Sequence, residues 1–268
     1  MQRITVQSAD GFILCGRSDA PEDPKAAVVI VHGLCEHYGR YEYLVEKLNA
    51  AGYAVVRFDH RGHGRSMGKK TWYDDRTQIV SDTDLFVERA RQLFPDLPLF
   101  MIGHSMGGFG AASYGTAYPG KLAGYVLSGA WTRDHKGLAK ADEALSDSTY
   151  VPNELGDGVC SDPAVGEAYL ADPLVAKEFS VALLRAVHEG HDWLRANAAA
   201  FADPVILLHG GDDGLVSPQD SIDFFEEISS TDKSLRIYAG LYHEIFNEFK
   251  RDQVIHDAIE WLDDELAH

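Results

Sequence analysis

The 268-residue chain contains few cysteines and no long hydrophobic run. Cys15, Cys35 and Cys160 do not have the spacing of metal ligands, and their odd number favours reduced thiols. No apolar run approaches the length that spans a bilayer, and the N-terminus shows no signal-peptide pattern. We therefore expect a cytoplasmic protein that does not insert stably into a membrane.

Basic residues are also scarce. The chain has 24 Lys and Arg against 42 Asp and Glu, which gives a formal net charge of −18. An excess of negative charge repels the phosphates of nucleic acids and of anionic lipids. Nucleic acid is therefore excluded as the main partner, and a small-molecule substrate is expected instead.

Strand-like and helix-like segments alternate along most of the chain. The expected strands are residues 3–6, 13–17, 26–31, 54–58, 99–103, 122–128, 205–208 and 235–238, and the expected helices are residues 41–51, 77–93, 105–117, 218–228 and 253–266. Such alternation is typical of a mostly parallel sheet covered by helices on both faces. The sequence thus predicts an α/β fold with a large core.

The alternation stops between residues 131 and 202, where no clear strand is visible. Asp162-Pro163 and Asp172-Pro173 could each begin a helix, and apolar residues recur at helical spacing from Phe179 to Val187. We expect a core made of residues 1–130 and 203–268, with residues 131–202 inserted as a helical cap. The alternative is a helical decoration remote from any site.

An apolar strand runs into Gly103-His104-Ser105-Met106-Gly107, and a segment rich in small residues follows. This pattern is typical of a strand, a sharp turn and a helix, with the serine exposed at the turn. A turn this tight brings Gly103 and Gly107 close together, so neither can carry a side chain. Ser105 is therefore the candidate nucleophile.

A second Gly-x-Ser-x-Gly occurs at Gly64 to Gly68, with Ser66 at its centre. Ser66 follows a polar loop and precedes Lys69-Lys70, so the strand and helix that the turn requires are missing. This context favours Ser105 over Ser66.

A serine hydroxyl needs a base, and the base needs an acid that orients it. In this fold the acid follows a strand after the serine. The strand 205–208 delivers Asp212 and Asp213, and either carboxylate could serve.

The base should follow the acid along the chain. His243 lies in a loop directly after a strand, whereas His256 lies within an amphipathic helix and His268 is the terminal residue. His243 is therefore the candidate base. The oxyanion of the reaction intermediate needs two donors, which we expect to be the backbone N–H groups of Leu34 and Met106.

The chain resembles α/β-hydrolases of the monoacylglycerol lipase and lysophospholipase group along nearly its whole length. The resemblance rests on His32-Gly33-Leu34-Cys35-Glu36-His37 with Gly39-Arg40-Tyr41, on Phe58 to Ser66, on Gly103 to Gly108, on Asp162-Pro163 with Asp172-Pro173-Leu174, and on Tyr242 to Glu248. It implies the α/β-hydrolase fold, Asp213 rather than Asp212 as the acid, and structural roles for Asp59 and Ser66.

The resemblance also implies a serine carboxylic-ester hydrolase that acts through an acyl-enzyme on Ser105 and needs no metal or cofactor. We expect the cap to supply an apolar acyl tunnel, with Trp131, Phe179 and Leu183 as candidate lining residues. Packing between the cap helices is the alternative role for these three. Alternative functions are a lysophospholipase, a hydroxycinnamoyl (feruloyl-type) esterase, or a non-catalytic binding module.

Overall fold

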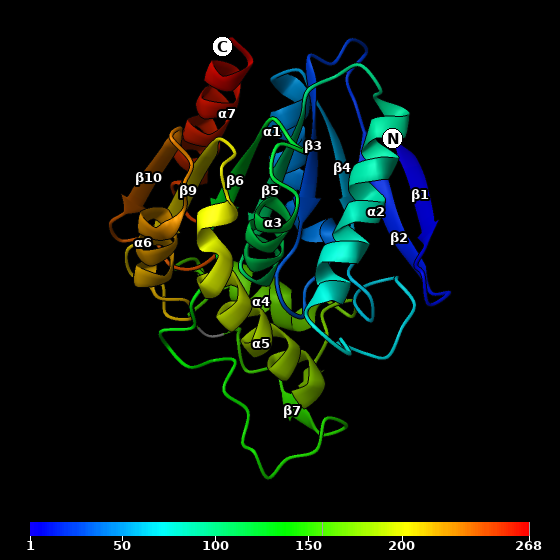
Figure 1. The fold of residues 1–268 in the computed structure, drawn as a ribbon, viewed down its shortest axis with the longest axis vertical. Coiled ribbons are helices and arrows are strands. Elements are labelled where there is room, and N and C mark those ends of the chain that lie inside the picture. Colours follow the sequence, from blue (N-terminus) through cyan, green and yellow to red (C-terminus); the bar gives the residue numbers. More distant parts are fainter. Residues whose placement is uncertain (157, 268) are drawn as a thin grey trace.

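The computed structural model describes residues 1–156 and 158–267. Its centre is an eight-stranded sheet in the order β1-β2-β4-β3-β5-β6-β9-β10 (Figure 1). The strands are β1 (Gln2–Gln7), β2 (Ile13–Asp19), β3 (Ala26–Val31), β4 (Tyr53–Phe58), β5 (Leu99–His104), β6 (Gly124–Ser128), β9 (Val205–Gly210) and β10 (Lys233–Tyr238).

The sheet is parallel from β4 to β10, and only β2 pairs antiparallel with its neighbours β1 and β4. The strand β3 lies between β4 and β5, so the chain winds outward from β3 in both directions. Ligands of open parallel sheets bind beyond the carboxyl ends of the strands at such a reversal. The fold therefore indicates a site beyond the carboxyl ends of β3 and β5. The strand order also confirms the α/β architecture predicted from the sequence.

Helices cover both faces of the sheet, because its central strands are apolar on both sides. Along β3, Val29 and Val31 belong to one hydrophobic cluster, and Val28 and Ile30 belong to the other. The first cluster includes residues of α2 (Thr77–Leu93), α3 (Met106–Ala117) and α6 (Pro218–Glu227), and the second includes residues of α1 (Glu42–Ala50) and α7 (Arg251–Ala267). A short 3₁₀ helix, η1 (Tyr38–Tyr41), precedes α1.

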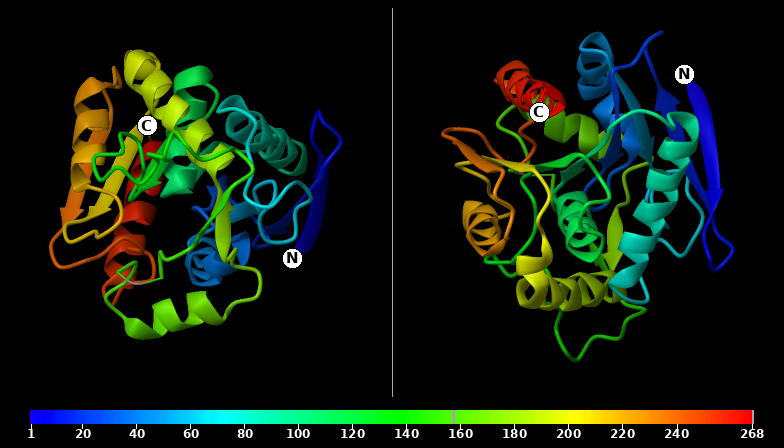
Figure 2. Two further views of the ribbon diagram at one scale, coloured as in Figure 1. Left: turned by 90° about the horizontal axis from the view of Figure 1, so that it is seen from below. Right: turned by 45° about the horizontal axis from the view of Figure 1, so that its top comes forward.

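The segment between β6 and β9 contributes no strand to the central sheet within its described residues. It contains β7 (Tyr150–Pro152), α4 (Pro163–Ala171), β8 (Glu178–Ser180), α5 (Val181–Asn197) and η2 (Ala198–Ala200). Figure 1 shows α4, α5 and β7 together at the lower end of the sheet, and the view from below in Figure 2 looks onto them. We refer to residues 131–202 as the insertion.

The two Asp-Pro pairs of the insertion differ in structure. Asp162 caps α4 as expected, because its carboxylate accepts a hydrogen bond from Ala164 N at 3.0 Å. The expectation that Asp172-Pro173 begins a helix was wrong, since Asp172 follows the end of α4 and begins a turn. Its carboxylate accepts from Leu174 N at 2.8 Å, which stabilises that turn.

Among the described residues, no helix has the length and apolar composition needed to span a bilayer. Cys15, Cys35 and Cys160 are all free thiols. Burial raises the pKa of the Cys35 thiol well above its usual value, so this cysteine is unreactive.

Candidate active site

Ser105 occupies the turn between β5 and α3 in a strained conformation, with φ 56° and ψ −120°. The backbone around it is too crowded for side chains. A Cβ at Gly103 would lie 2.4 Å from the carbonyl oxygen of Gly107, and a Cβ at Gly107 would lie 2.1 Å from that of Val31. The two glycines are therefore required by close backbone packing, which holds the serine at the carboxyl end of β5.

A pocket lies over Ser105 and is also lined by His243. Its apolar wall consists of Leu34, Trp131, Leu138, Leu155, Val159, Leu215 and Val216, and its polar residues include Glu36, Arg40, His104, Tyr169 and Glu244. Of the three insertion residues proposed from the sequence, Trp131 lines this pocket. Phe179 and Leu183 are buried in the larger hydrophobic cluster and are not among the described lining residues.

Asp213 lies 30 residues before His243, and the two side chains meet in a buried contact. The His243 Nδ1–H donates to Asp213 Oδ2 at 2.7 Å. Asp213 is 3% exposed, whereas the neighbouring Asp212 is exposed. Burial would raise the pKa of Asp213, but His243 and His209 outweigh burial and hold it well below its usual range.

The environment of His243 suits a base that becomes a cation during the reaction. Burial would lower its pKa, but the charge and hydrogen bond of Asp213, together with Glu244 and Glu36, raise it. Of the two alternative histidines, His256 is exposed on α7, and His268 lies outside the described residues.

The loop after β3 passes close to Ser105. A Cβ built on Gly33 would lie 3.1 Å from Ser105 Cβ, and the next residue, Leu34, lines the pocket. The N–H of Gly33 donates to Glu36 Oε1 at 2.6 Å, so a buried carboxylate holds this loop from behind. Met106 is the first residue of α3 and directly follows Ser105. The loop of Leu34 and the first residue of α3 are therefore both next to Ser105.

One side of the pocket contains a buried group of two carboxylates and one guanidinium. Arg40 forms two hydrogen bonds to the Glu244 carboxylate, at 2.7 and 2.8 Å, and a third to Glu36 Oε2 at 2.9 Å. Burial would raise the pKa of Glu36, but Arg40 and His104 lower it, so it stays ionised. Two carboxylates and one guanidinium give the group a formal charge of −1.

His104 lines the same pocket and lies beside His243. Its ring lies 4.7 Å from the ring of His243, centroid to centroid. Burial lowers the pKa of His104 to about 4, with the neighbouring His243 as a further cause, so His104 is neutral at physiological pH. Its Nδ1 lies 3.1 Å from Ser128 O, which makes Nδ1 the protonated nitrogen.

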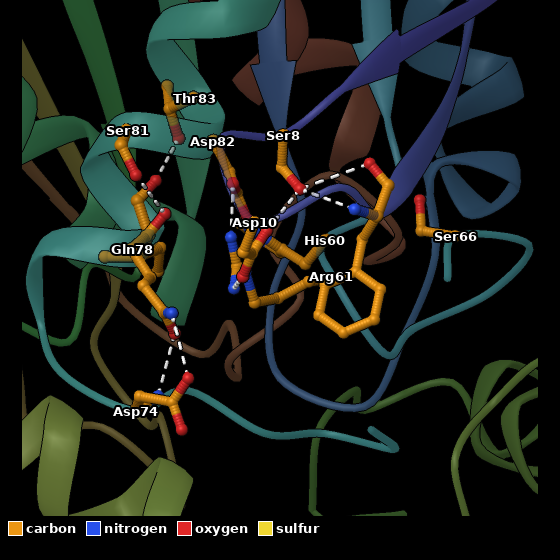
Figure 3. A network of polar contacts seen from close by, with 12 residues as sticks. Ser8, Asp10, His60, Arg61, Ser66, Asp74, Gln78, Ser81, Asp82 and Thr83 are labelled. Carbon is orange, nitrogen blue, oxygen red and sulfur yellow. Dashed lines mark hydrogen bonds and ion pairs between the residues drawn. The ribbon is translucent and has the colours of Figure 1, made fainter. Parts of the chain in front are cut away.

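Ser66 lies in a different setting, in the loop after β4. Its hydroxyl donates to Asp59 O at 2.6 Å and accepts from Cys15 N at 2.8 Å. Figure 3 shows the polar network that holds this loop, in which Arg61 joins Asp82 on α2 to Asp10 in the β1–β2 turn. Ser66 is therefore a structural link between the loop and β2.

The insertion is hydrogen-bonded to the loop that carries Leu34. The Ala176 N–H donates to Cys35 O at 2.8 Å. The His37 Nε2 lies 2.8 Å from Asp172 Oδ2, while His37 Nδ1 accepts from Gly39 N. The conformation of the loop after β3 thus depends on the insertion.

The insertion is also hydrogen-bonded to the loop that carries His243. Glu244 N donates to Val159 O at 2.7 Å. The buried Glu248 carboxylate accepts from Tyr242 N at 3.0 Å, from Ser161 N at 2.8 Å and from the Ser161 hydroxyl. Two loops of the candidate site are therefore attached to one insertion.

The site has no obvious place for a metal: within the described ranges, no group of three or more His, Cys, Asp or Glu side chains could hold an ion. The feature that sequence reasoning missed is the pairing of Arg40 with Glu244. Both residues lie in motifs quoted for the resemblance, but a contact across 204 residues leaves no local pattern.

Comparisons with known proteins agree with this geometry. The family described as serine aminopeptidase S33 matches residues 22–250. A monoacylglycerol lipase of Mycolicibacterium smegmatis is 37% identical over 90% of this chain and 89% of its own. A phospholipase of Bacillus subtilis is 31% identical over 90% of this chain and 96% of its own.

The crystal structure of the Paleococcus ferrophilus monoacylglycerol lipase superposes with a TM-score of 0.83 at 30% identity, covering 94% of this chain and 99% of that one. The chain therefore belongs to the serine aminopeptidase S33 family of α/β-hydrolases, as a carboxylic-ester hydrolase of the monoacylglycerol lipase group.

Proposed function

We propose that Ser105, Asp213 and His243 form the catalytic triad of this esterase, and that the N–H groups of Leu34 and Met106 form its oxyanion hole. The observation that carries the proposal is the buried hydrogen bond from His243 to Asp213, beside a pocket that His243 shares with Ser105. This arrangement matches the roles of nucleophile, base and orienting acid.

In the proposed mechanism, Ser105 Oγ attacks the ester carbonyl while His243 Nε2 takes the hydroxyl proton. Asp213 stabilises the imidazolium that forms, and the two N–H groups stabilise the oxyanion. His243 then gives the proton to the leaving alcohol, which leaves an acyl-enzyme on Ser105. Water attacks this ester in the same way, releasing the carboxylic acid and regenerating the serine.

We propose a monoacylglycerol as the substrate. Support comes from the two-sided pocket, whose wall of leucine and valine side chains suits an acyl chain. The carboxylates of Glu36 and Glu244 on its polar side can accept hydrogen bonds from the hydroxyls of a glycerol group. The identity with the Mycolicibacterium smegmatis monoacylglycerol lipase supports the same substrate class.

A lysophospholipid is the second candidate, favoured by the similarity to the Bacillus subtilis phospholipase. The electrostatics of the pocket argue against it. Arg40 is the one Lys or Arg among the described lining residues, and its charge is already paired with Glu36 and Glu244 rather than free for a phosphate. The negative charge of the group formed by Glu36, Glu244 and Arg40 disfavours binding of an anionic headgroup. It has no such effect on binding of an uncharged glycerol group.

The nucleophile can be tested by treating the protein with a fluorophosphonate and mapping the adduct by mass spectrometry. We expect a single adduct on Ser105 and no adduct on Ser66. An adduct elsewhere, or none, rejects the proposed triad.

The substrate can be tested with esters of one acyl chain that differ only in the alcohol: a monoacylglycerol, the matching lysophospholipid and a simple alkyl ester, with a hydroxycinnamate ester alongside. We expect the highest kcat/KM for the monoacylglycerol. A higher value for the lysophospholipid rejects the argument from the acidic group.

We also propose that the insertion acts as a cap over the core formed by residues 1–130 and 203–268, and that its residues Phe179 and Leu183 influence acyl selection. The presence of Trp131, Leu138, Leu155 and Val159 on the pocket wall supports the cap. A cytoplasmic location stays part of the proposal and is supported by the three free thiols.

A further inference from the structure

Asp213 is bound by two histidines, and the proposed mechanism uses only one of them. His209, near the end of β9, is fully buried, and its Nε2 lies 3.0 Å from Asp213 Oδ2. We infer that His209 is a positioning residue, which holds the Asp213 carboxylate in the orientation that His243 requires. This inference rests on the proposed roles of Ser105, Asp213 and His243.

The carboxylate of Asp213 accepts four hydrogen bonds in the structure. Its Oδ1 accepts from Leu215 N at 2.8 Å and from Val216 N at 2.9 Å. Its Oδ2 accepts from His209 Nε2 and from His243 Nδ1. Two oxygens have about four lone-pair sites, so the carboxylate is fully satisfied, and His209 supplies the only donor besides His243 among the described partners of Oδ2.

The surroundings of the His209 ring determine which nitrogen carries hydrogen. Nε2 faces two acceptors, the Asp213 carboxylate and, at 3.3 Å, Val216 O, so it must be protonated. Nδ1 lies 2.7 Å from the hydroxyl of Ser221 on α6, which can donate to it. A neutral His209 therefore has one permitted tautomer, with Nε2–H directed at Asp213.

This donor has a definite effect on catalysis. It fixes the rotation of the Asp213 side chain, so that Oδ2 meets His243 at 2.7 Å. It also withdraws negative charge from the oxygen that stabilises the His243 imidazolium. Without the donor, the carboxylate keeps its hydrogen bonds from Leu215 N and Val216 N but orients the His243 ring less exactly. Its Oδ2 also keeps more negative charge, which stabilises the imidazolium and raises the pKa of His243.

Two variants separate positioning from simple packing. His209→Leu fills the space without a donor, whereas His209→Gln keeps an amide N–H at the end of its side chain. We expect His209→Leu to lower kcat by about tenfold to a hundredfold with little change in KM, because the misplacement affects proton transfer rather than binding. We expect His209→Gln to recover most of the loss.

The pH profile gives a readout that a packing defect would not change. In His209→Leu, the acid limb of kcat/KM should move to higher pH, because the less stabilised carboxylate raises the pKa of His243. His104, Glu36 and Glu244, which also face His243, are the same in every variant. Rates are expressed per Ser105 titrated with fluorophosphonate, so misfolded protein does not count.

The wild-type protein provides a test that does not depend on folding of a variant. Nitrogen-15 NMR of histidine-labelled protein should show His209 protonated at Nε2 across the pH range in which His243 titrates. An unprotonated Nε2, or His209→Leu with an unchanged rate per labelled serine and an unchanged pH limb, overturns the inference. Failure of Ser105 to react would instead reject the triad itself, whatever His209 does.

Discussion

The two Gly-x-Ser-x-Gly segments of this chain share one sequence pattern but lie in different structural settings. Ser66 lies in an irregular loop, where its hydroxyl is bound on both sides by the backbone of Asp59 and Cys15. Ser105 lies between a strand and a helix at positive φ, on the wall of a pocket. The elements on either side of the serine, rather than the five residues of the pattern, therefore distinguish the proposed nucleophile Ser105 from the structural link Ser66.

The largest expected effect comes from removing the reactive hydroxyl. Ser105→Ala should lower kcat by at least about four orders of magnitude, because no covalent intermediate can form. Hydrolysis of an aryl ester measures the loss. Ser66→Ala is the matched control and should keep its rate within about twofold per folded molecule. A large loss of rate in the control would break the contrast between the two turns.

The adjacent carboxylates Asp212 and Asp213 allow a second contrast. Asp213→Asn should lower kcat about 10³- to 10⁴-fold, because the amide cannot stabilise the imidazolium of His243. Asp212→Asn should have little effect, since that side chain is exposed. Equal losses in the two variants would contradict the assignment of the acid.

The reactivity of Ser105 should depend on pH through His243. The base must be neutral to accept a proton, and its pKa is raised above the ordinary value of 6.5. The acid limb of kcat/KM should therefore lie above pH 6.5, with about a tenfold fall per pH unit below the pKa. Fluorophosphonate labelling rates, measured from pH 5 to pH 9, should follow the same curve, and a limb below 6.5 would contradict it.

The smallest expected effect is on stability. Ser66→Ala leaves the Cys15 N–H without its partner, which should cost about 1–3 kcal/mol of unfolding free energy. For a chain of this size, that corresponds to a fall in Tm of roughly 2–4 °C per kcal/mol. Thermal unfolding followed by circular dichroism measures it. An unchanged Tm would show that Ser66 does not hold the loop.

The regular elements of the core could be predicted because their patterns are local. The helix expected at residues 77–93 is α2 at Thr77–Leu93, and the apolar run 26–31 is β3. The insertion was harder, since β7 and β8 have only three residues each and pair with each other rather than with the central sheet. The pair Asp172-Pro173 carries the same helix-start signal as Asp162-Pro163, but its carboxylate is bound to Leu174 and His37 in a turn.

The candidate site was predictable as far as chain order and strand ends could place it. That reasoning led to Ser105 and His243, and the resemblance added Asp213. Partners without a local pattern were not predictable, such as Glu244 beside Arg40. The expected helical face from Phe179 to Val187 was wrong at its first residue, because Phe179 lies in β8 and the helix α5 begins at Val181.

The hydrogen bonds between the insertion and the core have a consequence for protein engineering. Exchanging the whole insertion for that of a relative would remove the hydrogen bonds to Cys35, Glu244 and Glu248, and so would alter the pocket over Ser105 together with the loops that carry Leu34 and His243. A modular exchange should keep residues 159–161 and 172–176 as fixed junctions and vary only the sequence between and around them. The rest of the insertion could then be exchanged without losing the hydrogen bonds that join it to the core.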